Sequence, residues 1–438
     1  MLIDPRKFIT GPFRPCPKCG KPEFGTLNVG DHYISRRCRE CWHTDGERLP
    51  PLNKKIVYLD QMILSNMAKT LDPEWGKQRP QQDGYWARAF DALDRALKLQ
   101  LIVCAYSRTH ERESVVLPHF QVLRRLYEHL ALGMELEWHT RIHYLQLTHA
   151  FRQKLHGEKV DYGLIPRERV LHGDLTAWAE RIRVSVNWSA AYPDPEEVRR
   201  TRTRSGKAFE TTFARWASEK KSFPEVYKFE RQGYAETIVT LLREHLAAIQ
   251  KANATREITD AVWNYRLEIE IVDGLCKVAL QAGVAPEDAV KLVAEFLYSQ
   301  EAFDAPANDI SALLMAALAR RAAAGQKPPS PGMWNDITTI SAYLPYCDAM
   351  YLDDQCAELL REGPLDQKVV HATRVFSNKT REDFLEYVAD LEREAGPAHT
   401  ARVVDVYGEK WLTPYRAILV YERERQAKRK AEAQPRAE

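Results

Sequence analysis

The sequence predicts an α/β protein built on a central parallel sheet, with a large all-helical insertion and a small cysteine-bearing module at the N-terminus. Three observations predict this: strand-like apolar runs occur in two distant parts of the chain, helical periodicity fills the residues between them, and four cysteines are paired near the start. At 438 residues the chain is too long for one ordinary core. We therefore expect several domains, or one domain with a large insertion.

The composition indicates a folded chain with little charge bias. Hydrophobic residues make up 45% of the chain, and 63 Lys plus Arg face 61 Asp plus Glu. Any nucleic-acid surface must therefore be local. The sequence shows no apolar leader and no run of about 18 uncharged apolar residues, which argues against secretion and against a membrane span. We expect a cytoplasmic protein, and the cysteine usage suits a reducing compartment.

Residues 1–50 contain the most specific motif. Two C-x-x-C pairs are separated by 18 residues, and they consist of Cys16, Cys19, Cys38 and Cys41. Each pair offers two thiolates from a tight turn, and two pairs complete the tetrahedral sulfur shell that zinc prefers. The stretch resembles a zinc ribbon with a short hairpin. Four thiolates leave no open coordination position for water, so we expect structural zinc; the basic ribbon could also contact a nucleic acid or a protein partner.

The rest of the chain divides by pattern. In residues 54–115 the order is strand, helix, helix, strand, which predicts a βαβ crossover and hence a parallel sheet. Residues 116–305 have helical periodicity without a convincing strand, and the α/β pattern returns in residues 306–400. Residues 401–438 are expected to form a helix and a charged tail. The helical block is therefore an insertion that splits one α/β domain.

Four acidic residues follow strands or lie at the heads of helices. Asp60 ends the first strand, and Asp353 ends the strand in "AMYLD". Glu113 follows the second strand on a helix that also carries His110, and Asp336 opens a later helix. Because ligands of open parallel sheets bind at the carboxyl ends of the strands, we expect these four carboxylates to converge.

Converging carboxylates repel one another unless they are protonated or neutralised, and one or two hard cations such as Mg²⁺ or Mn²⁺ are the usual solution. Other acidic residues nearby are alternative candidates for the metal ligands. Glu111 competes with Glu113, Asp354 competes with Asp353, and Asp348, just before the strand, is a further candidate ligand. His110 is expected to support the site rather than act as a base.

Four segments together resemble a PIN-like nuclease domain: "KKIVYLDQMILSNMAK", "LIVCAYSRTHERES", "NDITTISAYLPYCDAMYLDD" and "TRVFSNKTREDFLEYV". The resemblance implies a three-layer α/β fold with a central parallel sheet. It also implies that Asp60, Glu113, Asp336 and Asp353 hold catalytic Mg²⁺ or Mn²⁺, and that water activated by the metal hydrolyses phosphodiester bonds.

The resemblance further implies an endonuclease that acts on RNA, as a toxin or as an effector of antiviral defence. Its RNA or DNA target and its oligomeric state, including a homo-oligomer, stay open. The alternative is a non-catalytic nucleic-acid-binding protein or scaffold subunit of a larger complex. We expect the basic segment "RRTRTRSGK", residues 199–207, to be an exposed loop that can grip RNA.

Overall fold

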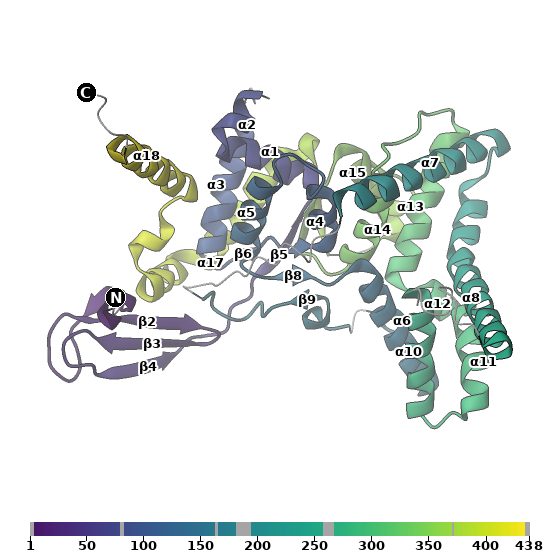
Figure 1. The fold of residues 1–438 in the computed structure, drawn as a ribbon, viewed down its shortest axis with the longest axis horizontal. Helices are drawn as coiled ribbons and strands as arrows, with labels where there is room; N and C mark the ends of the chain where they lie inside the picture. The colour runs from purple at the N-terminus through teal and green to yellow at the C-terminus, as the bar shows by residue number, and fades with distance from the viewer. Residues whose placement is uncertain are drawn as a thin grey trace.

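The protein is a mixed α/β molecule in which helices predominate. The computed structural model describes residues 4–78, 83–162, 165–180, 194–256, 267–369 and 372–433. A small antiparallel sheet lies at one end of the molecule, a short parallel sheet lies in the middle, and a group of long helices lies at the other end (Figure 1). The parallel sheet therefore joins segments from both halves of the chain.

The parallel sheet is assembled in the order β11-β10-β5-β6. Its strands are β5 (Lys55–Leu59), β6 (Ile102–Val103), β10 (Ala349–Tyr351) and β11 (Arg374–Phe376). All three neighbouring pairs are parallel, and β5 pairs with both β6 and β10. The crossover predicted between β5 and β6 is present, and the two distant α/β segments meet at the β5–β10 pair.

Each face of this sheet is covered by helices. The side chains of each strand alternate between the two faces and so contribute to two hydrophobic cores. Val57 and Leu59 belong to one core, whereas Ile56 and Tyr58 belong to the other. Helices contributing to the first core are α1 (Gln61–Leu71), α3 (Tyr85–Lys98), α5 (Phe120–Ala131) and α17 (Arg381–Tyr407). Helices contributing to the second are α7 (Pro195–Glu219), α13 (Pro306–Ala323), α14 (Met333–Tyr343) and α15 (Asp354–Arg361).

The segment between the two α/β halves is mostly helical. Its third core is formed largely by α6 (His139–Leu155), α8 (Phe223–Thr255), α10 (Leu267–Gln281), α11 (Pro286–Leu297) and α12 (Gln300–Phe303). The expectation that this segment contains no strand is wrong. Two short strands, β8 (Glu135–Leu136) and β9 (Leu171–His172), form a sheet with β7 (Tyr106–Ser107). Strands of two residues are too short to show an alternating pattern.

The N-terminal sheet packs on α17. It consists of β1 (Thr10–Arg14), β2 (Phe24–Gly30), β3 (Tyr33–Cys38) and β4 (Thr44–Arg48), all antiparallel. The Arg36 side chain is only 2% exposed and forms an ion pair of 3.0 Å with Asp405 of α17. Val29 and Ile34 share a core with Val403 and Val406. The module is thus fixed to the α/β body through both apolar and ionic contacts.

The remaining helices are short or peripheral, and they are α2 (Pro73–Gln78), α4 (Arg108–Ser114), α16 (Leu365–Lys368) and α18 (Tyr415–Ala433). Within the described residues, none of the helices has the length and apolar character needed to cross a bilayer.

Candidate functional site

Asp60 and Asp353 lie side by side because the strands that precede them are neighbours. Leu59 of β5 pairs with Tyr351 of β10, and the Asp60 amide continues the ladder with a 2.9 Å hydrogen bond to the Tyr351 carbonyl. Each aspartate also caps the helix that follows: Asp60 accepts from the Met62 amide at 2.7 Å, and Asp353 accepts from the Cys356 amide at 2.7 Å. Capping therefore orients both carboxylates at the same sheet edge.

Glu113 is brought to this edge by α4. The His110 ring is buried, and its Nδ1 accepts a hydrogen bond from the Ser107 amide, so its Nε2 carries the proton that is donated to the Leu59 carbonyl at 2.8 Å. Burial lowers the pKa of His110 to about 4, which keeps the ring neutral. Glu113 lies one turn after His110 on the same face of the helix, and α4 is tied to the residue before Asp60.

Asp336 comes from the first turn of α14, whose side chains Ile337 and Ile340 are buried in the core. The helix starts at Met333, three residues earlier than the sequence predicts. Its Asn335 donates a hydrogen bond of 3.4 Å to Glu113. The structure thus brings together all four acids expected at the sheet edge, and we call Asp60, Glu113, Asp336 and Asp353 the acid cluster.

The electrostatics of the acid cluster are those of carboxylates held close together. Burial, together with the charges of Glu113 and Asp353, raises the pKa of Asp60 to about 7. Burial and the charges of Asp60, Glu113 and Asp353 raise the pKa of Asp336 to about 9. Burial also raises the pKa of Glu113. All four residues are half-buried. Each ionised carboxylate here therefore destabilises the others unless a proton or a cation is present.

Cys356 is a neighbour of the acid cluster that the sequence analysis missed. One oxygen each of Asp336 and Asp353 and the Cys356 sulfur lie within 4.8 Å of one another. Burial and the adjacent aspartates raise the pKa of this thiol well above its usual range, which favours the protonated form. Its position three residues after Asp353 was the available signal, since that spacing places both on one helix face.

The structure distinguishes between the alternative acids. Glu111 faces away from the acid cluster and lines a cavity of about 790 Å³ beside α5 and β8, which none of the four acids lines. Asp354 accepts a hydrogen bond from the Lys379 amide at 3.3 Å. The acid cluster therefore contains Glu113 and Asp353, whereas Glu111 and Asp354 have other surroundings.

Asp348 does not join the acid cluster, contrary to its proposed role as a metal ligand. It precedes β10 and so lies at the amino ends of the parallel strands, opposite the end that carries the acid cluster. Its carboxylate accepts from the Ile56 amide at 2.9 Å and forms ion pairs with Lys55 and Arg167. The physical reason is the direction of the strand: a residue before a strand and a residue after it lie at opposite ends of the sheet.

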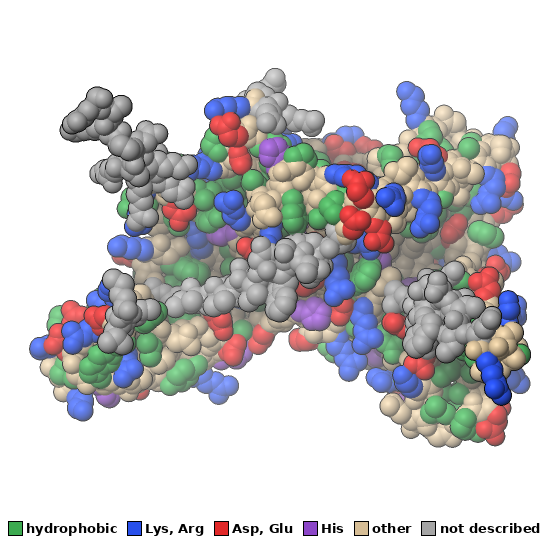
Figure 2. All heavy atoms as spheres, in the orientation of Figure 1, with side chains coloured by type: hydrophobic (Ala, Val, Ile, Leu, Met, Phe, Trp, Pro, Cys, Tyr) green, Lys and Arg blue, Asp and Glu red, His purple; other side chains and the backbone are tan. Residues whose placement is uncertain are grey.

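The expectation that residues 199–207 form a loop is wrong, because these residues are part of helix α7. Figure 2 shows Lys and Arg side chains along the surface formed by this helix. Helix α7 packs against both α4 and α14, which carry Glu113 and Asp336. Arg202 is the basic residue whose charge acts on these two acids, and it lowers the pKa of each, partly offsetting the effect of burial.

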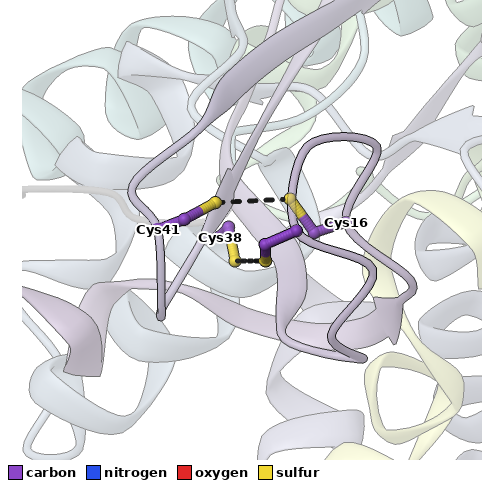
Figure 3. A group of neighbouring side chains, drawn as sticks. Cys16, Cys38 and Cys41 are labelled. Atoms are coloured by element: carbon purple, nitrogen blue, oxygen red, sulfur yellow. Dashed lines mark hydrogen bonds between the residues drawn. The ribbon is translucent and has the colours of Figure 1, made fainter.

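The second candidate centre is the cysteine cluster, which consists of Cys16, Cys19, Cys38 and Cys41. The four sulfurs lie within 4.8 Å of one another, with 3.5 Å between Cys16 and Cys41 and 3.7 Å between Cys19 and Cys38. Figure 3 shows the side chains pointing toward one another from the two turns. Tetrahedral zinc with Zn–S bonds of about 2.3 Å requires S–S separations of about 3.8 Å. The cluster can therefore hold a metal such as zinc.

In the absence of metal, the pKa values of Cys16 and Cys19 move in opposite directions. Burial opposes ionisation of Cys16, but hydrogen bonds from the backbone amides of Cys19 and Lys18 outweigh this effect and lower the pKa of Cys16 to about 7. A backbone hydrogen bond favours ionisation of Cys19, but burial and the neighbouring thiols outweigh it and raise the pKa of Cys19 to about 12. All eight cysteines of the chain are free thiols.

Comparison with known proteins gives no relative. No family model matches the chain, and neither the curated proteins nor the solved structures contain a significant match. Function is therefore inferred from the geometry of the two clusters.

Proposed function

We propose that the protein is a metal-dependent endoribonuclease of PIN-like type whose active site is the acid cluster. The observation that carries this proposal is the convergence of four carboxylates from β5, α4, α14 and β10 at the carboxyl edge of a parallel sheet. Carboxylate oxygens are the ligands preferred by Mg²⁺ and Mn²⁺. A set of four partly exposed carboxylates, with their pKa values raised by burial and by one another, fits such cations.

The residues divide the work. Asp60 and Asp353 are oriented by helix capping, so they present their remaining oxygens in fixed directions. Glu113 is oriented by Asn335, and Asp336 completes the cluster from the side of α14. These four acids would hold a divalent cation, which would supply activation of water for attack on phosphorus and stabilisation of the leaving oxygen. His110 keeps α4 in place and takes no proton from substrate, because both ring nitrogens are engaged.

We propose that the cysteine cluster binds one structural zinc ion and that the N-terminal sheet is a zinc ribbon. Four thiolates close the coordination sphere, which leaves catalysis to the acid cluster. The ribbon presents basic side chains and is fixed to α17, so it serves as an adaptor for nucleic acid or for a protein partner. Because the α/β segments resemble PIN-like nucleases, we further propose a role as a toxin or an effector of antiviral defence.

The test is cleavage of labelled single-stranded RNA, structured RNA and DNA by the purified protein in Mn²⁺ or Mg²⁺, with EDTA as the metal-free arm. Asp60→Asn and Asp353→Asn remove charge but keep good helix caps, since Asn caps as well as Asp. Glu111→Gln is the matched control, because it neutralises an acid that faces away from the cluster. We expect metal-dependent cleavage of RNA by the wild type and by the control only.

Cleavage by both aspartate variants at the wild-type rate would contradict the site. Absence of cleavage under every condition, with retained RNA binding, would instead favour the non-catalytic binding protein or complex subunit.

A further inference from the structure

Helix α7 has a buried stripe with one arginine in it. Its buried residues are Val198, Gly206, Phe209, Phe213 and Trp216. Arg202 lies four residues after Val198 and four before Gly206, so it occupies the position on this stripe between them. A side chain at that position is directed toward the body of the protein. Arg202 is nevertheless exposed, so its side chain reaches solvent at the margin of the packed core.

The end of the Arg202 side chain lies beside the acid cluster. Gly206 brings α7 close to the segment before α14, since a Cβ at this position would lie 3.1 Å from the Pro331 Cβ. At the next residue, Gly332, a Cβ would lie 3.8 Å from Arg202 Nη2 and also 3.8 Å from Asp336 Oδ2. The guanidinium and the Asp336 carboxylate therefore lie next to the same glycine. The close approach of two backbones at Gly206 fixes this relation.

The Arg202 guanidinium faces the acid cluster without being neutralised by it. Its charge acts on both Glu113 and Asp336, yet among the described residues it forms no ion pair within 4.0 Å. By contrast, Arg199 on the same helix pairs with Glu196 and donates to the Val116 carbonyl. A guanidinium that stays apart from nearby carboxylates is available to a ligand that bridges the two.

We propose that Arg202 binds the phosphate of the substrate next to the acid cluster, so that the helical insertion supplies part of the active site. This inference rests on the proposed function, because the ligand is the phosphodiester of RNA. A planar guanidinium matches phosphate oxygens bidentately. The cluster alone is strongly anionic and repels a phosphodiester, whereas a fixed arginine at its edge offsets that repulsion and aligns the phosphate with the carboxylates.

The same helix offers matched controls. Arg200, Arg204 and Lys207 are exposed and do not lie on the buried stripe. If the basic surface of α7 attracts RNA only by general charge, removing any of these residues should weaken binding as much as removing Arg202. If Arg202 has a specific role, its removal should have a distinct effect.

The experiment compares Arg202→Gln, Arg202→Lys and Arg204→Gln in the full chain. Binding of a fluorescent single-stranded RNA is measured at several salt concentrations in an Asp353→Asn background, which slows cleavage, and cleavage is measured in the wild-type background. We expect Arg202→Gln to lower RNA affinity by roughly 10- to 100-fold. The slope of log affinity against log salt should also fall by about 0.7, the value for one phosphate contact on a single strand. Arg202→Lys should recover part of the affinity, and Arg204→Gln should change it less than threefold.

Mn²⁺ binding, measured by calorimetry, separates a phosphate-binding role from a structural one. Arg202→Gln should bind Mn²⁺ at least as tightly as the wild type, because it removes a positive charge next to the carboxylates. Loss of Mn²⁺ binding in Arg202→Gln would show that Arg202 organises the acid cluster instead, and would overturn the inference.

The outcomes also separate this inference from the proposed nuclease function. Cleavage by the wild type with equal effects of Arg202→Gln and Arg204→Gln would overturn the inference and leave the function standing. RNA binding that depends on Arg202, without cleavage in any metal, would support the inference and overturn the function. No RNA binding and no cleavage would overturn both.

Discussion

The cysteine cluster and the acid cluster are two groups of four side chains of types that can bind metal, but they are built in opposite ways. The four cysteines lie within a stretch of 26 residues on two tight turns and approach one another with S–S distances of 3.5 and 3.7 Å. The four acids come from four separate segments between residues 60 and 353. They meet because β5 and β10 are adjacent and because α4 and α14 bring Glu113 and Asp336 to the same end of the sheet. One cluster is local in sequence, and the other is a product of the whole α/β fold.

The difference teaches how each cluster can be used. A closed set of four thiolates suits a structural ion and leaves no position for a substrate. A set of carboxylates at the open edge of a sheet keeps coordination positions free for water and phosphate. The cysteine cluster should therefore affect stability more than catalysis, and the acid cluster should do the reverse. The following predictions test this contrast.

The largest effect is expected from Asp353→Asn on catalysis. The substitution keeps the cap on α15 but removes a charged ligand, and we expect RNA cleavage to fall by about 10³-fold, or about 4 kcal/mol of transition-state stabilisation. Stability in EDTA should be unchanged or higher, because one repulsive charge is gone. Single-turnover cleavage measures the effect on catalysis, and thermal melting in EDTA measures the effect on stability. A large loss of stability would contradict the expectation that the acid cluster affects catalysis more than stability.

The next effect is expected from the double variant Cys16→Ser, Cys19→Ser. Metal analysis should show the loss of about one zinc ion per chain, and the N-terminal sheet should lose stability because metal binding is coupled to its folding. Cleavage by the acid cluster should fall less than about tenfold. Hydrogen exchange of the β2 and β3 amides measures the stability of the N-terminal sheet. Loss of all cleavage while the α/β body stays folded would contradict the expectation that the cysteine cluster affects stability more than catalysis.

A third prediction concerns pH. In the absence of metal, folded Asp60 and Asp336 hold protons up to pKa values of about 7 and about 9, whereas the unfolded acids release them near their usual value of 3.8. The folded state thus binds more protons, so stability should fall as pH rises from about 4 to 9. Each proton bound only by the folded chain contributes a slope of about 1.4 kcal/mol per pH unit.

Urea unfolding at several pH values in EDTA measures this slope. Asp336→Asn should flatten it, and saturating Mn²⁺ should abolish it, because the carboxylates of the cation-bound folded chain are then ionised like those of the unfolded chain. A stability that rises with pH in EDTA would mean that the acids are not coupled as described.

The smallest effects are expected from Glu111→Gln and Asp354→Asn. These acids are sequence neighbours of Glu113 and Asp353 but face the cavity beside α5 and the Lys379 amide. Cleavage should change less than about twofold. A loss comparable to that of Asp353→Asn would show that the site uses the other acid of each pair.

The sequence predicted the parts of the fold that have local signatures. The C-x-x-C pairs, the crossover from β5 to β6 and the four acids at strand ends and helix heads all follow from short motifs and periodicity. Asp348 precedes the strand and Asp353 follows it, so the rule that ligands bind at the carboxyl ends of parallel strands could already have excluded Asp348 from the sequence.

The sequence pattern of helix α7 is misleading. Its run of arginines indicates a loop, whereas the buried stripe from Val198 to Trp216, on which Arg202 lies, becomes evident only from the packing of the helix. The short strands β8 and β9 and the proximity of Cys356 to Asp336 likewise depend on contacts between distant segments.

The central claim is that the four acids form one metal site, and calorimetric titration with Mn²⁺ at pH 7 tests it most directly. Because Asp336 is protonated at this pH, binding of Mn²⁺ should release protons, which is measured by repeating the titration in two buffers of different ionisation enthalpy. We predict that the wild type and Asp348→Asn bind Mn²⁺ and release protons. In Asp336→Asn, both the Mn²⁺ affinity and the number of released protons should be lower. Absence of Mn²⁺ binding in the wild type, or equal binding by the two variants, would contradict the account.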